Sequence, residues 1–120
     1  MVGILIVDDD SDAGEAMSEL LAYQGFAVAL ASDGQRALEA LRRADTLPDV
    51  ILLDLMMPVM NGWQFRKAQL DDPQLAAVPV IVVTASLASE SQLSQLKAVA
   101  LFRKPVDAGT LVRKINHICH

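Results

Sequence analysis

Five short apolar segments alternate along this chain with amphipathic segments, and this alternation limits the fold more than any other sequence feature. The apolar segments span residues 3–7, 26–31, 50–53, 78–83 and 99–102, and the first of them is rich in β-branched residues. Runs of this kind are typical of strands that are buried on both faces of a parallel sheet. The sequence therefore predicts an α/β domain in which each of five strands is followed by a helix.

The segments between the apolar runs have the spacing and end signals of helices. Asp12 and Glu15 have the spacing of a capping box for the first helix, and Gly25 is expected to end that helix. Further helices are expected after residue 34, over 63–70, over 86–97 and after Asp107, which can cap the last one.

The order of these elements leads to one specific fold. Right-handed crossovers place helices on both faces of a parallel sheet, which makes the domain doubly wound. We therefore expect a flavodoxin-like fold with five parallel strands in the order 2-1-3-4-5 and five helices. The 120 residues are expected to form a single domain, 1–120. They are too few for a TIM barrel, which needs about 250 residues.

Composition excludes several classes of protein. Hydrophobic residues make up 52% of the chain and charged residues 21%, so a disordered chain is excluded. The net charge of −5 argues against direct binding to nucleic acid, because phosphates attract basic surfaces. The apolar runs are much shorter than the ~20 residues of a membrane span, and the single cysteine fits a reducing compartment. A soluble, cytoplasmic protein without membrane contact is expected.

Chemically active side chains follow four of the five predicted strands. Asp8 and Asp9 follow the first strand, Asp54 the third, Thr84 the fourth and Lys104 the fifth. In an open parallel sheet, ligands bind at the carboxyl ends of the strands, near the point where the strand order reverses. The sequence therefore predicts that three carboxylates, one hydroxyl and one ammonium meet at this edge.

This set of groups favours magnesium-dependent phosphoryl chemistry. Neighbouring carboxylates repel one another, and a hard divalent cation relieves the repulsion. Mg²⁺ prefers oxygen ligands and is the expected cofactor. One carboxylate could then attack a phosphoryl group and form an acyl phosphate, with Lys104 supplying positive charge and Thr84 a hydroxyl donor. The groups are sufficient for reversible phosphorylation of an aspartate.

Four motifs in this order resemble the receiver domain of two-component response regulators, and the resemblance covers essentially the whole chain. The motifs are Ile4-Leu5-Ile6-Val7-Asp8-Asp9, the segment 51–62 (ILLDLMMPVMNG), Thr84-Ala85 and Lys104-Pro105. Each motif alone is weak, but the four together at strand ends are highly specific. The resemblance implies a phosphorylation-switched signalling module that catalyses only its own phosphotransfer and dephosphorylation and is otherwise no enzyme.

The resemblance also implies roles for the acidic residues. Asp54 would be the phosphoacceptor. Asp9 and Asp54 would bind Mg²⁺ directly, the Met56 carbonyl would be a third protein ligand, and Asp8 would act through metal-bound water.

The remaining implications concern the phosphoryl group and the partners. Thr84 and Lys104 would contact the phosphoryl oxygens, and the Lys104–Pro105 peptide bond would be cis. The phosphoryl donor would be a histidine kinase or a histidine phosphotransfer protein. The downstream partner is not defined by the sequence, and neither is the oligomeric state, for which a homodimer is one option.

The sequence departs from the family pattern on one side of the predicted site. Where the family often has Tyr or Phe three residues before the lysine, this chain has Leu101. The stretch from Thr84 to Lys104 is slightly shorter than is usual, and the glycine commonly found before the fifth strand is missing. These departures put switching by an aromatic side chain in doubt and suggest that the fourth helix or its loop is trimmed.

Three other functions compete with this interpretation. A haloacid-dehalogenase-like phosphatase would need a second aspartate two residues after the nucleophile, where this chain has Met56. A flavodoxin-like nucleotide binder would need a phosphate loop after the first strand, where Asp8 and Asp9 would repel phosphate. A receiver-like interaction module that is never phosphorylated is the third alternative, and the intact acidic set argues against it.

The resemblance to receiver domains also implies that the side chains two residues after the phosphoacceptor and two residues after Thr84 flank the water that hydrolyses the acyl phosphate. In this chain they are Met56 and Ser86. A methionine orients water poorly and shields the phosphoryl group by its bulk. We therefore expect a persistent phosphorylated form.

Overall fold

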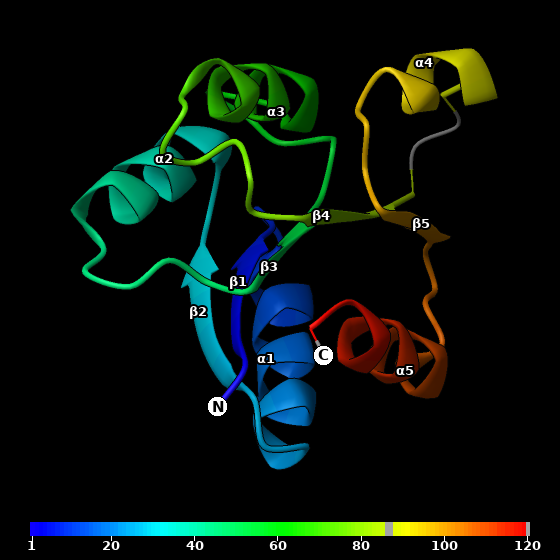
Figure 1. The fold of residues 1–120 in the computed structure, drawn as a ribbon. Coiled ribbons are helices and arrows are strands. Elements are labelled where there is room, and N and C mark those ends of the chain that lie inside the picture. The colour runs from blue at the N-terminus through cyan, green and yellow to red at the C-terminus, as the bar shows by residue number, and fades with distance from the viewer. Residues whose placement is uncertain (86–87, 120) are drawn as a thin grey trace.

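The computed structural model describes residues 1–85 and 88–119, which form five strands and five helices in strict alternation (Figure 1). The strands are β1 (Gly3–Val7), β2 (Ala27–Ala31), β3 (Val50–Leu53), β4 (Val80–Thr84) and β5 (Ala100–Arg103). The helices are α1 (Ser11–Tyr23), α2 (Gly34–Arg43), α3 (Gly62–Asp71), α4 (Glu90–Ser94) and α5 (Ala108–Ile118).

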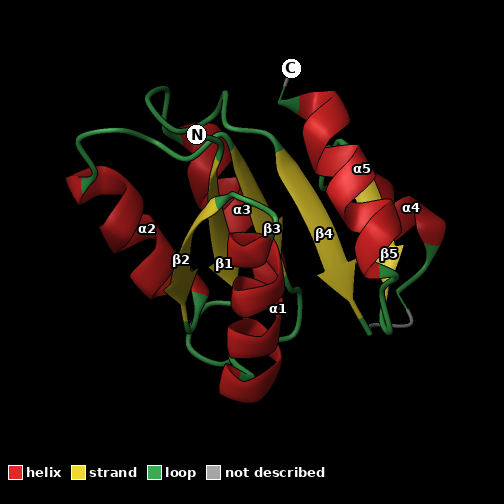
Figure 2. Cartoon of the chain, turned by 90° about the horizontal axis from the view of Figure 1, so that it is seen from below, coloured by secondary structure: helices red, strands yellow, loops and turns green. Residues whose placement is uncertain are grey.

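The strands form one parallel sheet in the order β2-β1-β3-β4-β5, which confirms the predicted doubly wound, flavodoxin-like topology. Figure 2 shows helices on both sides of the sheet. One face packs on α1 and α5, through residues such as Leu21 and Ile115. The other face packs on α2, α3 and α4, through residues such as Leu38 and Phe65. The sheet is therefore covered on both sides, as a parallel sheet requires.

The apolar runs behave as predicted in the middle of the sheet and less regularly at its edges. Every residue of β3 and β4 is buried, whereas β2 and β5 each have exposed positions because they pair on one side only. Some strand bounds differ from the prediction. Strand β4 begins at Val80 instead of residue 78, because Pro79 has no N–H for the ladder. Strand β2 begins after Phe26, whose N–H instead bonds to Leu21 in α1.

The cap of α1 and the length of α4 differ from the sequence prediction. The cap of α1 is Asp10, whose carboxylate accepts the N–H of Ala13 at 3.2 Å, and the predicted capping box of Asp12 and Glu15 does not form. The sequence pattern predicts a fourth helix over 86–97, but within its described part only Glu90–Ser94 is helical, in line with the trimming that the short stretch between Thr84 and Lys104 suggests. This segment is polar and serine-rich, so few apolar residues hold it on the core, and it turns at Lys97, whose φ is 53°. No helix among residues 1–85 and 88–119 is long and apolar enough to cross a bilayer.

Helix α3 begins directly against the end of β3, and a glycine allows this approach. The N–H of Gly62 bonds to the carbonyl of Leu55 at 2.9 Å. A Cβ at Gly62 would lie 2.6 Å from the carbonyl oxygen of Asp54, which is closer than real contacts allow. Any side chain at this position would push α3 away from the loop that follows β3.

Candidate functional site

Two neighbouring strands place the side chains of Asp8 and Asp54 side by side. In the register of β1 and β3, Val7 lies opposite Leu53, so the residues that follow them emerge at the same level of the sheet edge. The backbones of Asp8 and Asp54 both continue the hydrogen-bond pattern of the sheet. The N–H of Asp54 bonds to Val7 at 2.9 Å, and the N–H of Asp8 bonds to Ala31 in β2 at 3.0 Å. The strand pairing, and not a flexible loop, therefore sets the distance between these two carboxylates.

The three aspartates predicted to bind a cation come together. Asp8, Asp9 and Asp54 each offer a carboxylate oxygen, and these oxygens lie within 4.8 Å of one another. Asp54 is buried, Asp8 is half-buried and Asp9 is exposed. The site is thus sheltered at its base and open to solvent on the Asp9 side.

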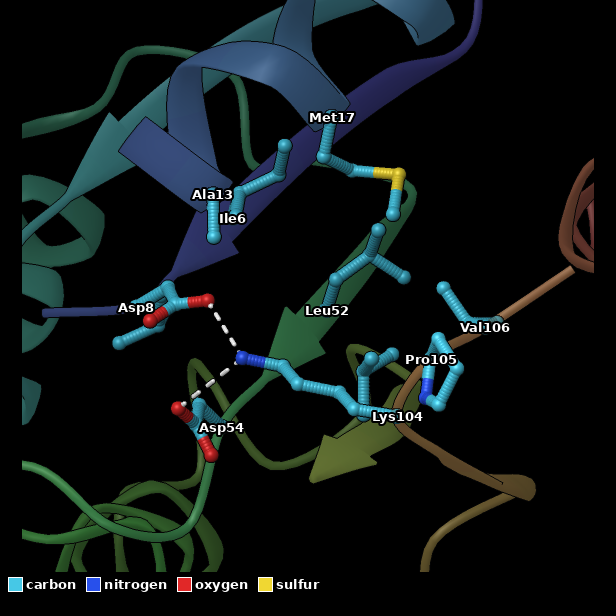
Figure 3. A pocket seen from close by; sticks show the side chains of 11 residues that line it. Ile6, Asp8, Ala13, Met17, Leu52, Asp54, Lys104, Pro105 and Val106 are labelled. Atoms are coloured by element: carbon cyan, nitrogen blue, oxygen red, sulfur yellow. Dashed lines mark hydrogen bonds and ion pairs between the residues drawn. The ribbon is translucent and has the colours of Figure 1, made fainter. Parts of the chain in front are cut away.

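Lys104 reaches this cluster from the far side of β4, as Figure 3 shows. Its Nζ lies 3.1 Å from Oδ2 of Asp8 and 3.5 Å from Oδ2 of Asp54. The Lys104–Pro105 peptide bond is cis, as predicted. One ammonium therefore bridges two of the three carboxylates.

The other predicted residues are Thr84 and Met56. Thr84 is buried at the end of β4, and its carbonyl accepts the backbone N–H of Lys104 at 2.9 Å. Met56 is 62% exposed, and its backbone N–H lies 3.4 Å from Oδ1 of Asp54. The roles predicted for the Thr84 hydroxyl and the Met56 carbonyl stay predictions. Ser86, the other residue expected beside the hydrolytic water, lies outside the described residues.

Backbone groups that sequence reasoning missed also hold Asp54. The N–H of Leu55 donates to Oδ1 of Asp54 at 2.7 Å, together with the longer contact from Met56. Oδ1 is therefore held by backbone donors, while Oδ2 is directed toward Lys104. Backbone donors of this kind leave no mark in the residue types, so no signal in the sequence could have revealed them.

The structure also has an apolar cavity of about 460 Å³ beside Lys104, which the sequence did not suggest (Figure 3). Its walls come from β1, α1, β3, β4 and the turn before α5. Asp8, Asp54 and Lys104 line one part of this cavity, and apolar side chains such as Met17, Leu52 and Val106 line another.

The pKa values of the site follow from its burial and crowding. Burial raises the pKa of Asp54, the ammonium of Lys104 lowers it, and the charge of Asp8 raises it again, with a net rise. Burial alone would lower the pKa of Lys104. Its hydrogen bond to Asp8 and the negative charges of Asp54 and Asp8 outweigh burial, so its pKa is raised. The ionised form of Asp54 is therefore disfavoured in the folded chain, and Lys104 stays charged at neutral pH.

This raised pKa predicts how Asp54→Asn changes stability in the absence of Mg²⁺. Below the ordinary pKa of aspartate both folded and unfolded chains are protonated at Asp54. As pH rises, the unfolded chain ionises first, so the wild type loses stability until pH passes the raised folded pKa. Asparagine cannot ionise, so the variant should melt at a higher temperature at neutral pH, and the difference should shrink in acid. Thermal melts from pH 3 to pH 8 check this, and an equal difference at every pH would contradict it.

The donor set fits a magnesium ion. Three carboxylates with oxygens within 4.8 Å of one another match the hard oxygen ligands that Mg²⁺ requires. The same carboxylates carry three negative charges against the single positive charge of Lys104. A divalent cation would balance the remaining charge.

Fold and site together define a class of protein: a flavodoxin-like domain whose carboxyl-edge site combines three aspartates with a lysine. The family model described as response regulator receiver domain matches residues 4–116. The chain belongs to this family, whose members are signalling modules of two-component systems.

Relatives and solved structures agree with this assignment. Protein PilH of Pseudomonas aeruginosa is 34% identical over 120 residues, with 98% of each chain covered. The DNA-binding response regulator MtrA of Mycobacterium tuberculosis is 34% identical over 115 residues, which are 94% of this chain but 48% of MtrA. The structure of chemotaxis response regulator CheY4 of Vibrio cholerae superposes with a TM-score of 0.86 at 30% identity, covering 98% of each chain.

Proposed function

We propose that this chain is a phosphorylation switch in which Asp54 accepts a phosphoryl group from a histidine kinase or a histidine phosphotransfer protein. The observation that supports this most strongly is the cluster around Asp54. Its carboxylate lies with those of Asp8 and Asp9 and is contacted by Lys104 at 3.5 Å. We also propose that residues 1–120 form one receiver domain whose phosphorylation changes its contacts with a downstream protein.

Asp54 acts as the nucleophile. Because backbone N–H groups hold its Oδ1, Oδ2 is the oxygen that attacks the phosphorus atom of a phosphohistidine. A P–O bond forms, the P–N bond of the donor breaks, and the imidazole nitrogen keeps the electron pair. The fixed strand ends hold the nucleophile in position, and positioning is a large part of phosphoryl-transfer catalysis.

Lys104 and Thr84 stabilise the transferred group. The ammonium of Lys104 already lies between Asp8 and Asp54, so it can donate to a phosphoryl oxygen as charge develops there. The hydroxyl of Thr84, at the end of the next strand, is the proposed second donor. Once the acyl phosphate has formed, the ammonium of Lys104 balances negative charge on its oxygens and the hydroxyl of Thr84 donates a hydrogen bond to one of them.

Mg²⁺ would be held by Asp9 and Asp54 directly, by the Met56 carbonyl, and by Asp8 through water. When bound, the ion supplies the positive charge that neutralises the phosphoryl oxygens. The exposed position of Asp9 and the sheltered position of Asp54 leave one side of the cluster accessible from solvent.

Direct labelling tests the proposal. The chain is incubated with Mg²⁺ and acetyl phosphate, and its intact mass is measured, followed by mapping of the modified peptide. The expected result is the addition of one phosphoryl group on the peptide that contains Asp54. A chain that gains no phosphate with Mg²⁺ present would instead support the receiver-like module that is never phosphorylated.

A phosphatase that turns over a phosphate ester is the weaker alternative. Two residues after Asp54, where such an enzyme needs an acid, the side chain is the exposed thioether of Met56. A thioether cannot donate a proton to a leaving group. Steady turnover of a simple phosphate ester would revive this alternative.

The side chain of Met56 is expected to make the phosphorylated form long-lived. It is the exposed residue two positions after Asp54, and it offers no strong hydrogen bond to orient a water. Met56→Asn should shorten the lifetime of the phosphate by a few-fold or more, because an amide can position the attacking water. The measurement is loss of phosphate over time in wild type, Met56→Asn and Ser86→Ala. If Met56→Asn decays at the wild-type rate, then Ser86 alone orients the water.

A further inference from the structure

A buried arginine that the phosphorylation site does not use joins α3 to the segment 90–103, named here the α4–β5 segment. Arg66 lies in α3 and is only 6% exposed. Its Nε donates to the carbonyl of Leu96 at 2.7 Å and an Nη donates to the carbonyl of Lys97 at 2.9 Å. Charged side chains are rarely buried to this extent without a specific role.

The hydrogen bonds of the Arg66 guanidinium go to neutral oxygen atoms. Its other Nη donates to Oε1 of Gln69 at 2.8 Å, and Arg66 forms no ion pair with any carboxylate of residues 1–85 and 88–119. Gln69 is fully buried, and its amide donates to the carbonyls of Leu75 and Val78. Burial lowers the pKa of Arg66, but a guanidinium remains charged at any physiological pH. Three carbonyl oxygens therefore accept hydrogen bonds from one guanidinium, and only the planar set of N–H donors of arginine matches this arrangement.

The carbonyls of Leu96 and Lys97 lie in a part of the α4–β5 segment that has little regular structure of its own. Helix α4 has five residues, too few to be stable alone, and the chain leaves it through Lys97 in the left-handed region. The carbonyls of Leu96 and Lys97 follow the end of α4 at Ser94 and lie in the turn that leads to β5. Arg66 supplies hydrogen-bond donors to both of them from another helix. Figure 1 shows α3 and α4 on the same side of the sheet.

The same contact links the two parts of the chain that meet at the phosphorylation site. Arg66 is one helical turn from Gly62, which packs directly on the carbonyl of Asp54. The carbonyls that Arg66 binds precede β5, which leads to Lys104. On its outer side the α4–β5 segment lines a groove of about 500 Å³ that includes Leu93, Lys97 and Leu101.

We propose that Arg66 is a positioning residue that fixes the α4–β5 segment on α3, and that the response of this segment to phosphorylation of Asp54 depends on it. The second half of the proposal rests on the proposed function. The contact attaches the α4–β5 segment to α3. Without it, the segment would be loose in both states and would transmit little of the change at Asp54.

The test is amide hydrogen exchange of residues 90–99 in wild type and Arg66→Met, with and without phosphorylation by acetyl phosphate and Mg²⁺. Methionine keeps the apolar stem but leaves both carbonyls unpaired, so exchange in the unphosphorylated variant should rise by about tenfold or more. The difference between phosphorylated and unphosphorylated forms should largely disappear. Arg66→Lys can reach only one carbonyl and should give intermediate exchange. It also provides a folded variant if Arg66→Met does not fold.

Controls separate this proposal from general destabilisation and from the proposed function. Arg43→Met removes an exposed arginine from α2 and should leave exchange of residues 90–99 at the wild-type rate. Unchanged basal exchange in Arg66→Met, or an undiminished phosphorylation-dependent difference, would overturn the proposal. A wild-type chain that gains no phosphate would refute the proposed function and the dependence on phosphorylation. The basal comparison would then still decide whether Arg66 positions the segment.

Discussion

Asp54→Asn should abolish phosphorylation by acetyl phosphate or by a phosphorylated histidine donor. Asp54 is the carboxylate held by backbone donors at one oxygen and directed toward Lys104 at the other. An amide of the same shape cannot act as the nucleophile, so the intact mass should stay that of the unmodified chain. The expected loss is complete at any incubation time at which the wild type is labelled.

Asp45→Asn is the matched control, because it makes the same chemical change at an exposed loop position. This control should be labelled like the wild type. Undiminished labelling of Asp54→Asn at another residue would refute the assignment of the phosphoacceptor. Labelling of neither wild type nor control would refute phosphorylation itself.

Asp9→Asn should lose most of its affinity for Mg²⁺ while the metal-free chain becomes somewhat more stable. The substitution removes one of three crowded carboxylates, so it removes a ligand and also relieves repulsion. A ligand that binds only the folded chain raises its melting temperature. Addition of Mg²⁺ should therefore stabilise the wild type clearly and Asp9→Asn very little. Calorimetric titration and thermal melts with and without Mg²⁺ measure both effects.

Asp10→Asn is the control for this second experiment. Asp10 is the next carboxylate in the chain, but it caps α1 and is not a member of the carboxylate cluster. Asparagine caps helices about as well as aspartate, so this variant should bind Mg²⁺ with nearly wild-type affinity. Normal affinity in Asp9→Asn, or an equal loss in both variants, would refute the proposed ligand set.

The central strands and the site cluster could be predicted from sequence because their signals are local. Runs such as 50–53 are apolar at every position, which only a strand covered on both faces requires. Each such run ends in a polar residue, and parallel strands bring these ends to one edge. For this reason the meeting of Asp8, Asp9, Asp54 and Lys104 follows from the order of the elements alone.

The missed features depend on contacts between distant segments. Helix α4 is shorter than predicted because its polar residues cannot hold a longer helix on the core. Arg66 has the sequence signature of an ordinary surface residue of α3, and only the carbonyls some 30 residues further along reveal its role. The cavity beside Lys104 likewise forms from five separate parts of the chain.

The register of β1 and β3 has a mechanical consequence for the switch. Asp8 and Asp54 continue adjacent strands from opposed residues, so the β1–β3 ladder fixes the spacing of these two carboxylates. Lys104 follows β5, which β4 separates from β3, and its ammonium reaches the carboxylates on a long, partly exposed side chain. In the proposed switch, Lys104 can therefore move from Asp8 toward a phosphoryl group without breaking any strand pairing, whereas a change in the Asp8–Asp54 spacing would break the ladder.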